Sequence, residues 1–321
     1  MLIHEQLKIY KVQLPLPFKP SEIDCYAIKG KNGWSLVDSG FSYKKCILGW
    51  QEFMQTNGIK PQDINGIYLT HSHLDHYCLS GWLQQLSGAP VYISASEAKA
   101  QERYQTAART KEFAEVLLKN GIPSKLISSE METFMIAGRI PEQELPELTI
   151  IKPGEKVLLG DFEYSVVLTP GHTKGHTCFY NKQFGILLSG DHILPEITTN
   201  IGLWPWNASN PISNYLASLE SCRNLNCKLV LPAHGKPFSN LAERISVLQE
   251  IYREKCDLAK SFVAKETTVY EVVQQVYGEA VRDINLALAM GTVFAQLTFL
   301  CNKGELKLTE KEGKSFFSLP G

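Results

Sequence analysis

Three histidines and one aspartate lie within six positions of the segment Ile67 to Gly81, which reads I-Y-L-T-H-S-H-L-D-H-Y-C-L-S-G. These residues are His71, His73, Asp75 and His76. They follow an apolar run with the composition of a buried strand. Residues two apart on an extended chain point the same way, so the first two histidines can face one point and the Asp-His pair a second. Imidazole and carboxylate are ligands that zinc, iron and manganese accept, which favours a metal site over a solvated polar turn.

The same design recurs at three further places in the chain, where a short apolar strand is followed by a histidine or an aspartate. The strands are predicted at Glu163 to Leu168, Gly185 to Leu188 and Lys228 to Leu231. Loops at strand ends converge in layered α/β proteins, because the sheet fixes where each loop begins. The converging set is therefore His71, His73, Asp75, His76, His172, Asp191 and His234.

Seven ligands are too many for one tetrahedral ion, but they suit two ions that share a carboxylate. A structural zinc site would use cysteines and close all four positions, whereas none of these ligands is a thiol. Imidazole and carboxylate ligands leave the metal Lewis acidic, so that the pKa of bound water falls from about 15.7 to about 7. This pattern predicts a hydrolytic centre with two divalent ions. Zn²⁺ is favoured, and iron or manganese would also suit the ligands.

The four motifs, in this order, resemble those of metallo-β-lactamase-fold hydrolases. The family pattern H-x-H-x-D-H is matched by residues 71 to 76, and G-H-T-x-G-H by Gly171 to His176. The strand-ending aspartate is matched by Gly190-Asp191 and the last histidine by Ala233-His234-Gly235. The resemblance covers roughly residues 7 to 240. It implies a four-layer αββα sandwich with the site along one sheet edge.

The resemblance also implies how the ligands divide between the two metals. His71, His73 and His172 would hold one ion, and Asp75, His76 and His234 the other, while Asp191 would bridge the two. Asp75 and Asp191 are accordingly the predicted catalytic residues, and a metal-bridging hydroxide the predicted nucleophile.

Residues next to the ligands have several interpretations. Asp38 at a strand end is either a turn former or a residue that supports a ligand. His176 is expected to make a buried structural hydrogen bond rather than to bind metal. His192 would point away from the site, with proton donation as the alternative. The pair Tyr77-Cys78 departs from the glycine that many relatives carry, and we expect it to pack inward.

Two groups of apolar side chains are candidates for contact with substrate. Trp204 and Trp206, in a Pro- and Asn-rich loop, could form a wall for an acyl or aromatic group, or could be buried against a lid or a subunit partner. A helix is expected from Ser129, where Glu132 gives capping-box spacing, to about Gly138. On this helix Met131, Phe134 and Met135 could form a lid, although packing against the sheet is favoured.

Two domains are predicted: a catalytic domain at 1–240, with a helical lid-like insertion at about 97–147, and a linker helix plus small domain at 241–321. The order helix, helix, hairpin in the second resembles the winged-helix tail of endoribonuclease-type relatives. Residues 251–321 contain nine Lys or Arg and nine Asp or Glu. This balance lacks the positive charge that nucleic-acid binding requires, so packing or homodimer formation is favoured.

Composition excludes several classes of protein. The chain has 321 residues, 44% of them hydrophobic and 20% charged, with a formal net charge of −1. These values are typical of a soluble protein without a general attraction to polyanions. The eight cysteines contain no pair separated by two residues, which indicates free thiols and a reducing compartment. We expect no signal peptide, no membrane-spanning run and a cytoplasmic location.

The predicted function is hydrolysis of an ester, a thioester or a lactone of a small molecule. The first alternative is an endoribonuclease that acts on single-stranded RNA. A second is a mononuclear iron oxygenase, against which the full second ligand set argues. A non-catalytic binding module would not require all seven ligands.

Overall fold

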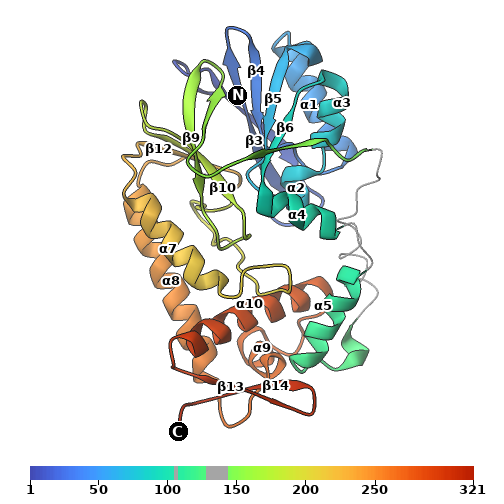
Figure 1. Cartoon of the computed structure of the whole chain (residues 1–321), viewed down its shortest axis with the longest axis vertical. Helices are drawn as coiled ribbons and strands as arrows, with labels where there is room; N and C mark the ends of the chain where they lie inside the picture. The colour runs from blue at the N-terminus through green and yellow to red at the C-terminus, as the bar shows by residue number, and fades with distance from the viewer. Residues whose placement is uncertain (105–107, 128–143) are drawn as a thin grey trace.

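The computed structural model describes residues 1–104, 108–127 and 144–321, and within them two mixed sheets pack face to face (Figure 1). The first sheet has the strand order β1 to β7. Its strands are β1 (Leu2–His4), β2 (Ile9–Pro15), β3 (Glu22–Gly30), β4 (Gly33–Val37), β5 (Ile64–Tyr68), β6 (Val91–Ser94) and β7 (Leu148–Ile151). Strands β1 to β4 pair antiparallel, and β4 to β7 pair parallel.

The second sheet has the order β12-β11-β10-β9-β8. Its strands are β8 (Lys156–Leu159), β9 (Phe162–Leu168), β10 (Thr177–Asn181), β11 (Ile186–Gly190) and β12 (Leu229–Pro232). Only β11 and β12 pair parallel in this sheet. A parallel pair needs a crossover connection, and here the connection contains the helix α7 (Pro211–Arg223).

Three hydrophobic clusters separate four layers and so establish the αββα arrangement. One cluster lies between the sheets and includes Ile28 and Val37 of the first and Phe179 and Leu188 of the second. A second packs the first sheet against α1 (Lys44–Thr56) and α3 (Ser80–Ser87). The third packs the second sheet against α7 and α8 (Leu241–Ser261). The α/β metallo-β-lactamase-type fold expected from the motifs is therefore confirmed.

The strands predicted before His172, Asp191 and His234 are present as β9, β11 and β12. Helix α7, which follows the loop that contains Trp204 and Trp206, was not predicted. The signal for this helix is in the sequence, because Asn210 caps it and Pro211 occupies its first turn. In the insertion predicted at about 97–147, the described residues include two helices, α4 (Ala95–Tyr104) and α5 (Ala108–Lys119).

The predicted helix from Ser129 to Gly138 lies outside the described residues. The same is true of its candidate lid residues Met131, Phe134 and Met135.

The C-terminal elements occur in the predicted order. They are α8, α9 (Val269–Tyr277), α10 (Asp283–Asn302) and a hairpin of β13 (Lys307–Lys311) and β14 (Lys314–Ser318). A capping box begins α9, with Thr268 and Glu271 bonded reciprocally. These helices share one hydrophobic cluster with Leu187 and Val230 of the second sheet, so the core continues across the predicted domain boundary at residue 240.

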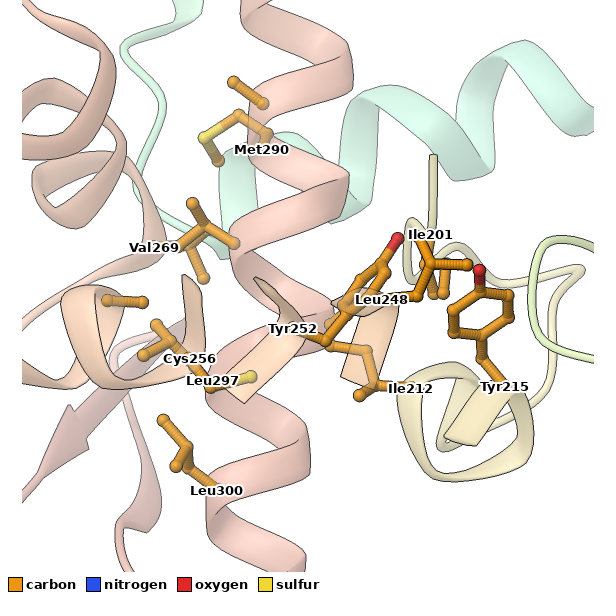
Figure 2. Packing of buried hydrophobic residues seen from close by; sticks show 14 of the residues in the cluster. Ile201, Ile212, Tyr215, Leu248, Tyr252, Cys256, Val269, Met290, Leu297 and Leu300 are labelled. Atoms are coloured by element: carbon orange, nitrogen blue, oxygen red, sulfur yellow. The ribbon is translucent and has the colours of Figure 1, made fainter. Parts of the chain in front are cut away.

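Within the described residues one helix, α10, is long and apolar enough to cross a membrane by length and composition. The expectation that no run approaches that length is therefore wrong for this segment. Met290 and Leu297 of α10 belong to the same cluster as α7, α8 and α9, and 56% of the apolar window is buried (Figure 2). Contacts inside the protein account for its apolar composition.

We expect the cluster between the sheets to carry much of the stability. Leu188→Ala, at a side chain only 1% exposed, should lower the free energy of unfolding by about 2–5 kcal/mol, because it removes buried contacts and leaves a cavity. Leu158→Ala, at a side chain 64% exposed on β8, should change it by less than about 0.5 kcal/mol. Urea denaturation of both variants measures this, and equal losses would contradict the assignment of the core.

Candidate metal centre

The seven predicted ligands lie together at one edge of the two sheets. His71 and His73 follow β5, and Asp75 and His76 lie on the short helix α2 (Leu74–Tyr77). His172 follows β9, Asp191 follows β11 and His234 follows β12. Residues from five places in the chain are thus brought together, and six of the seven side chains are less than one sixth exposed.

The ligand atoms form two groups that meet at Asp191. His71, His73 and His172 make the first group, and Asp75, His76 and His234 the second. In the first group the Nε2 atoms of His71 and His172 are 3.2 Å apart. In the second, Asp75 Oδ2 is 3.4 Å from His234 Nε2 and 3.8 Å from His76 Nε2.

Asp191 directs one oxygen toward each group. Its Oδ1 lies 3.4 Å from Nε2 of His76 and 3.4 Å from Nε2 of His234. Its Oδ2 lies 3.5 Å from Nε2 of His172. The carboxylate thus reaches both groups, as a bridging ligand must.

These separations fit divalent metal ions. Metal–ligand bonds of about 2.0–2.2 Å place the ligands of a tetrahedral ion about 3.3–3.6 Å apart, close to the 3.2–3.8 Å between the atoms here. Among the described residues, His76 Nε2 and Asp191 Oδ1 are buried without a hydrogen-bond partner. Such atoms are costly unless they bind a cation, so the donor set fits divalent metal.

Four histidines have their Nε2 lone pairs fixed toward the centre by the partners of Nδ1. His172 Nδ1 donates to the carbonyl of Asn200 at 2.7 Å, and His234 Nδ1 to that of Glu22 at 2.8 Å. A carbonyl oxygen only accepts, so each Nδ1 carries the proton and each Nε2 a lone pair. His76 Nδ1 donates to the carboxylate of Asp38, which likewise only accepts. The Thr70 hydroxyl gives its one hydrogen to Asp38, so it accepts from His71 Nδ1.

The electrostatics of the two groups differ. Burial, together with His76 and His73, lowers the pKa of His71 well below its ordinary value, and burial lowers the pKa of His73 to about 3. Burial also opposes charge on His76, but Asp191, Asp38 and Asp75 outweigh it and raise its pKa. His71 and His73 of the first group are therefore neutral imidazoles, whereas the second group concentrates negative charge.

Asp38 supports ligands of both groups. It is 2% exposed and adopts a left-handed backbone conformation, with φ of 61°. Its carboxylate accepts from the backbone N–H of Thr70 at 2.8 Å, from the Thr70 hydroxyl and from His76 Nδ1 at 2.8 Å. The structure therefore gives Asp38 the contacts of a supporting residue as well as its place in a turn.

His176 makes hydrogen bonds to protein groups. Its Nδ1 is 2.8 Å from the Thr169 hydroxyl, and its Nε2 accepts from the backbone N–H of Asp191 at 3.2 Å. His192 is fully buried, and its ring centroid lies 5.2 Å from that of Tyr215 and 6.0 Å from that of His176. Because its side chain is fully buried, His192 cannot donate a proton directly to a substrate.

Tyr77 and Cys78, which replace the glycine that many relatives carry, pack inward as expected. Both side chains belong to the cluster beneath α1 and α3 and are less than 5% exposed. Burial raises the pKa of Cys78 to about 12, so its thiol stays protonated at neutral pH.

Glu97 joins the two histidine-bearing loops and was missed by the sequence reasoning. It is 1% exposed in the first turn of α4, and its Oε2 accepts from the N–H and hydroxyl of Ser72, at 2.9 and 2.6 Å. Its Oε1 accepts from the N–H of Gly175 at 2.7 Å. A Cβ at Gly175 would lie 2.5 Å from Ser94 Oγ, which explains that glycine. The available signal was an acidic residue three positions after β6, the strand that neighbours β5.

Trp204 and Trp206 stack on each other, with ring centroids 5.9 Å apart. Trp204 also lies 5.1 Å from Phe113 of α5, and the Arg109 guanidinium is 4.6 Å from the Trp206 ring. Both tryptophans are half-buried. Much of the surface of both tryptophans is therefore buried against neighbouring side chains, as one of the two alternatives expected. Their contact with substrate stays a prediction.

Comparison with known proteins identifies related sequences. The sequence model of the Metallo-beta-lactamase superfamily matches residues 19–234. The probable metallo-hydrolase YqjP of Bacillus subtilis is 26% identical over 308 residues, which cover 91% of this chain and 92% of that protein. The human acyl-coenzyme A thioesterase MBLAC2 is 27% identical over 194 residues, which cover 59% of this chain and 62% of that protein.

Comparison of structures shows the fold. The crystal structure of the metallo-beta-lactamase family protein TTHA1429 from Thermus thermophilus aligns with a TM-score of 0.86 at 22% identity. The alignment covers 97% of this chain and 98% of that chain, and so includes the C-terminal helices.

Replacing Asp38 should weaken metal binding. In Asp38→Asn the amide N–H₂ must face either Thr70 or Nδ1–H of His76, so a donor opposes a donor and His76 loses its fixed tautomer. Asn tolerates the left-handed backbone. We expect metal affinity about 10–100-fold lower, measured by competition with a chromogenic chelator. Asp161→Asn, at the far end of β9 from His172, is the control, and equal affinities in both variants would contradict this role.

Replacing Glu97 should loosen both histidine loops. Gln at this position offers one acceptor oxygen where the carboxylate accepts three bonds, and its N–H₂ opposes an N–H. We expect the free energy of unfolding of Glu97→Gln to fall by about 1–3 kcal/mol and its metal affinity to fall about tenfold. Glu102→Gln, exposed on the same helix, serves as the matched control. Wild-type affinity in Glu97→Gln would show that the loops hold their geometry without it.

Proposed function

Because the chain belongs to the metallo-beta-lactamase superfamily and is a metal-dependent hydrolase, we propose that it works with two divalent metal ions on an ester, a thioester or a lactone. The position of Asp191 carries this proposal. One carboxylate with an oxygen toward each of two complete ligand groups is the arrangement that two neighbouring ions require. Zn²⁺ suits the nitrogen and oxygen donors, as iron and manganese do.

The chemistry such ions supply when bound is a lower pKa for water and polarisation of a carbonyl oxygen. The protein's own residues set where this happens. The side chains of Asp75 and Asp191 are 15% and 12% exposed, whereas that of His76 is fully buried. Water and substrate therefore approach on the carboxylate side. There Asp75 and Asp191 can accept hydrogen bonds from an attacking water and orient it toward the substrate carbonyl.

Thioesters are the favoured substrate class. The human relative is named an acyl-coenzyme A thioesterase, and a fungal relative is named an atrochrysone carboxyl ACP thioesterase. A buried nitrogen-rich centre without an accessible thiol suits attack by water on an acyl carbon. Trp204 and Trp206, half-buried beside Arg109, would offer an apolar surface to the acyl chain.

We also propose an alternative activity and roles for the C-terminal region. RNA cleavage is the alternative activity, and a winged-helix role for residues 241–321 would accompany it. The balanced charge of this region favours packing instead, either within the chain or in a homodimer. All eight cysteines are free, which supports a location in the reducing cytoplasm. The proposed partner there is a small-molecule substrate and not a membrane.

Metal analysis joined to a substrate panel tests the proposal. We expect about two metal equivalents per chain and turnover of acyl thioesters above that of lactones, phosphodiesters and single-stranded RNA. Asp191→Ala should reduce the metal content and lower turnover by more than the roughly 100-fold typical of losing a residue that only supports a ligand. Full activity with one equivalent, or near-normal turnover in Asp191→Ala, would sink the two-metal proposal. Preferential RNA cleavage would favour the alternative.

A further inference from the structure

The segment from Leu194 to Leu203, between β11 and α7, makes a hydrogen bond to one of the predicted metal ligands, His172. The carbonyl of Asn200 in this segment accepts the Nδ1 proton of His172 at 2.7 Å and so orients its Nε2. The segment contains no strand or helix. It therefore has no ladder or helical hydrogen bonds of its own to fix the position of Asn200.

Helix α8 supplies side chains along this segment. Arg244 donates to the carbonyls of Leu194 and Ile197, both at 2.7 Å. The hydroxyl of Tyr252, a residue only 3% exposed, donates to the carbonyl of Thr199, directly before Asn200. Figure 2 shows Tyr252 of α8 next to Ile201 of the segment, with Tyr215 of α7 beyond it.

Helix α10 contacts the segment from another side. The Thr292 hydroxyl lies 2.9 Å from Oδ1 of Asn200, and the carbonyl of Gly291 accepts from the N–H of Leu203 at 2.9 Å. Trp204 packs so closely on Gly291 that a Cβ there would lie 2.4 Å from its ring. Side chains of α8 thus bond to residues before Asn200 in the chain, and α10 bonds to Asn200 itself and to Leu203 after it.

We propose that α8 and α10 position His172, so that the C-terminal helices set the metal affinity of the group His71, His73 and His172. Ordering an irregular segment costs conformational entropy, and contacts that are already formed in the free protein remove that cost from metal binding. This inference rests on the metal-binding role proposed for His172, but not on the substrate. Tyr252 and Thr292 are positioning residues in this account.

The second ligand group does not depend on these helices. His76 is held by Asp38, which follows β4, and His234 by the carbonyl of Glu22 in β3. Both supports belong to the first sheet. Loss of the contacts from α8 and α10 should therefore weaken one group selectively.

Cobalt binding to the full-length chain tests the inference. In a His234→Ala background, which disables the second group, Co²⁺ is titrated and followed by its visible absorption. Tyr252→Phe with Thr292→Val removes two hydroxyls and keeps the packing. We expect Co²⁺ affinity at least about tenfold lower and an altered spectrum. Thr292→Ser, which retains the hydroxyl, should restore most of the affinity when it replaces Thr292→Val.

Two matched substitutions in the C-terminal region serve as controls. Tyr270→Phe removes a hydroxyl whose one bond among the described residues is with the Gln274 side chain, within α9. Thr298→Val removes a buried hydroxyl of α10 that has no partner among the described residues. Both should leave the Co²⁺ affinity within about twofold of the parent.

Unchanged affinity and spectrum in the folded double variant would overturn the inference. If circular dichroism shows the double variant unfolded, Tyr252→Phe and Thr292→Val are titrated singly. Affinity unchanged in both would overturn it equally. His172→Ala in the same background separates the two proposals. If it leaves Co²⁺ binding intact, the metal role of His172 fails. If it abolishes binding while the double variant does not, only the positioning by α8 and α10 fails.

Discussion

The site depends on holding nitrogen and oxygen lone pairs close together although these lone pairs repel one another. Nitrogens of His71 and His172 approach to 3.2 Å, and Asp191 adds negative charge beside them. No side chain would take this position alone, because a neutral imidazole can turn its lone pair away. Four of the five rings are fixed from behind by a carbonyl, a carboxylate or a hydroxyl. These acceptors lie in β3, just after β4, just after β5 and in the connection after β11. The two sheets hold these acceptors in place.

The sequence predicted the parts of the site that are local. His71 to His76 can be recognised because their spacing alone carries the chemistry, and a strand directly precedes them. The αββα layers were implied by the resemblance to metallo-β-lactamase-fold hydrolases, which rests on four ordered motifs of this kind. Asp38 could be proposed only as one of two alternatives, since its contact with His76 crosses 38 positions.

The remaining supports could not be predicted, because they depend on tertiary packing. Glu97 reaches Gly175 across 78 positions, and Tyr252 reaches Thr199 across 53. Neither residue has a neighbour in sequence that reveals its partner. The same applies to α10, whose uniform apolar composition gives no face to assign, and whose role follows only from the helices and loop around it.

The continuous core between the second sheet and the C-terminal helices has an evolutionary consequence. A module that recombines freely must carry its own interior, whereas here Leu187 and Val230 share theirs with Met290 and Leu297. Substitutions along residues 194 to 203 should therefore be inherited together with changes at positions 252 and 292. Divergence of this lineage would then proceed by joint adjustment of the two regions, rather than by exchange of one C-terminal unit for another.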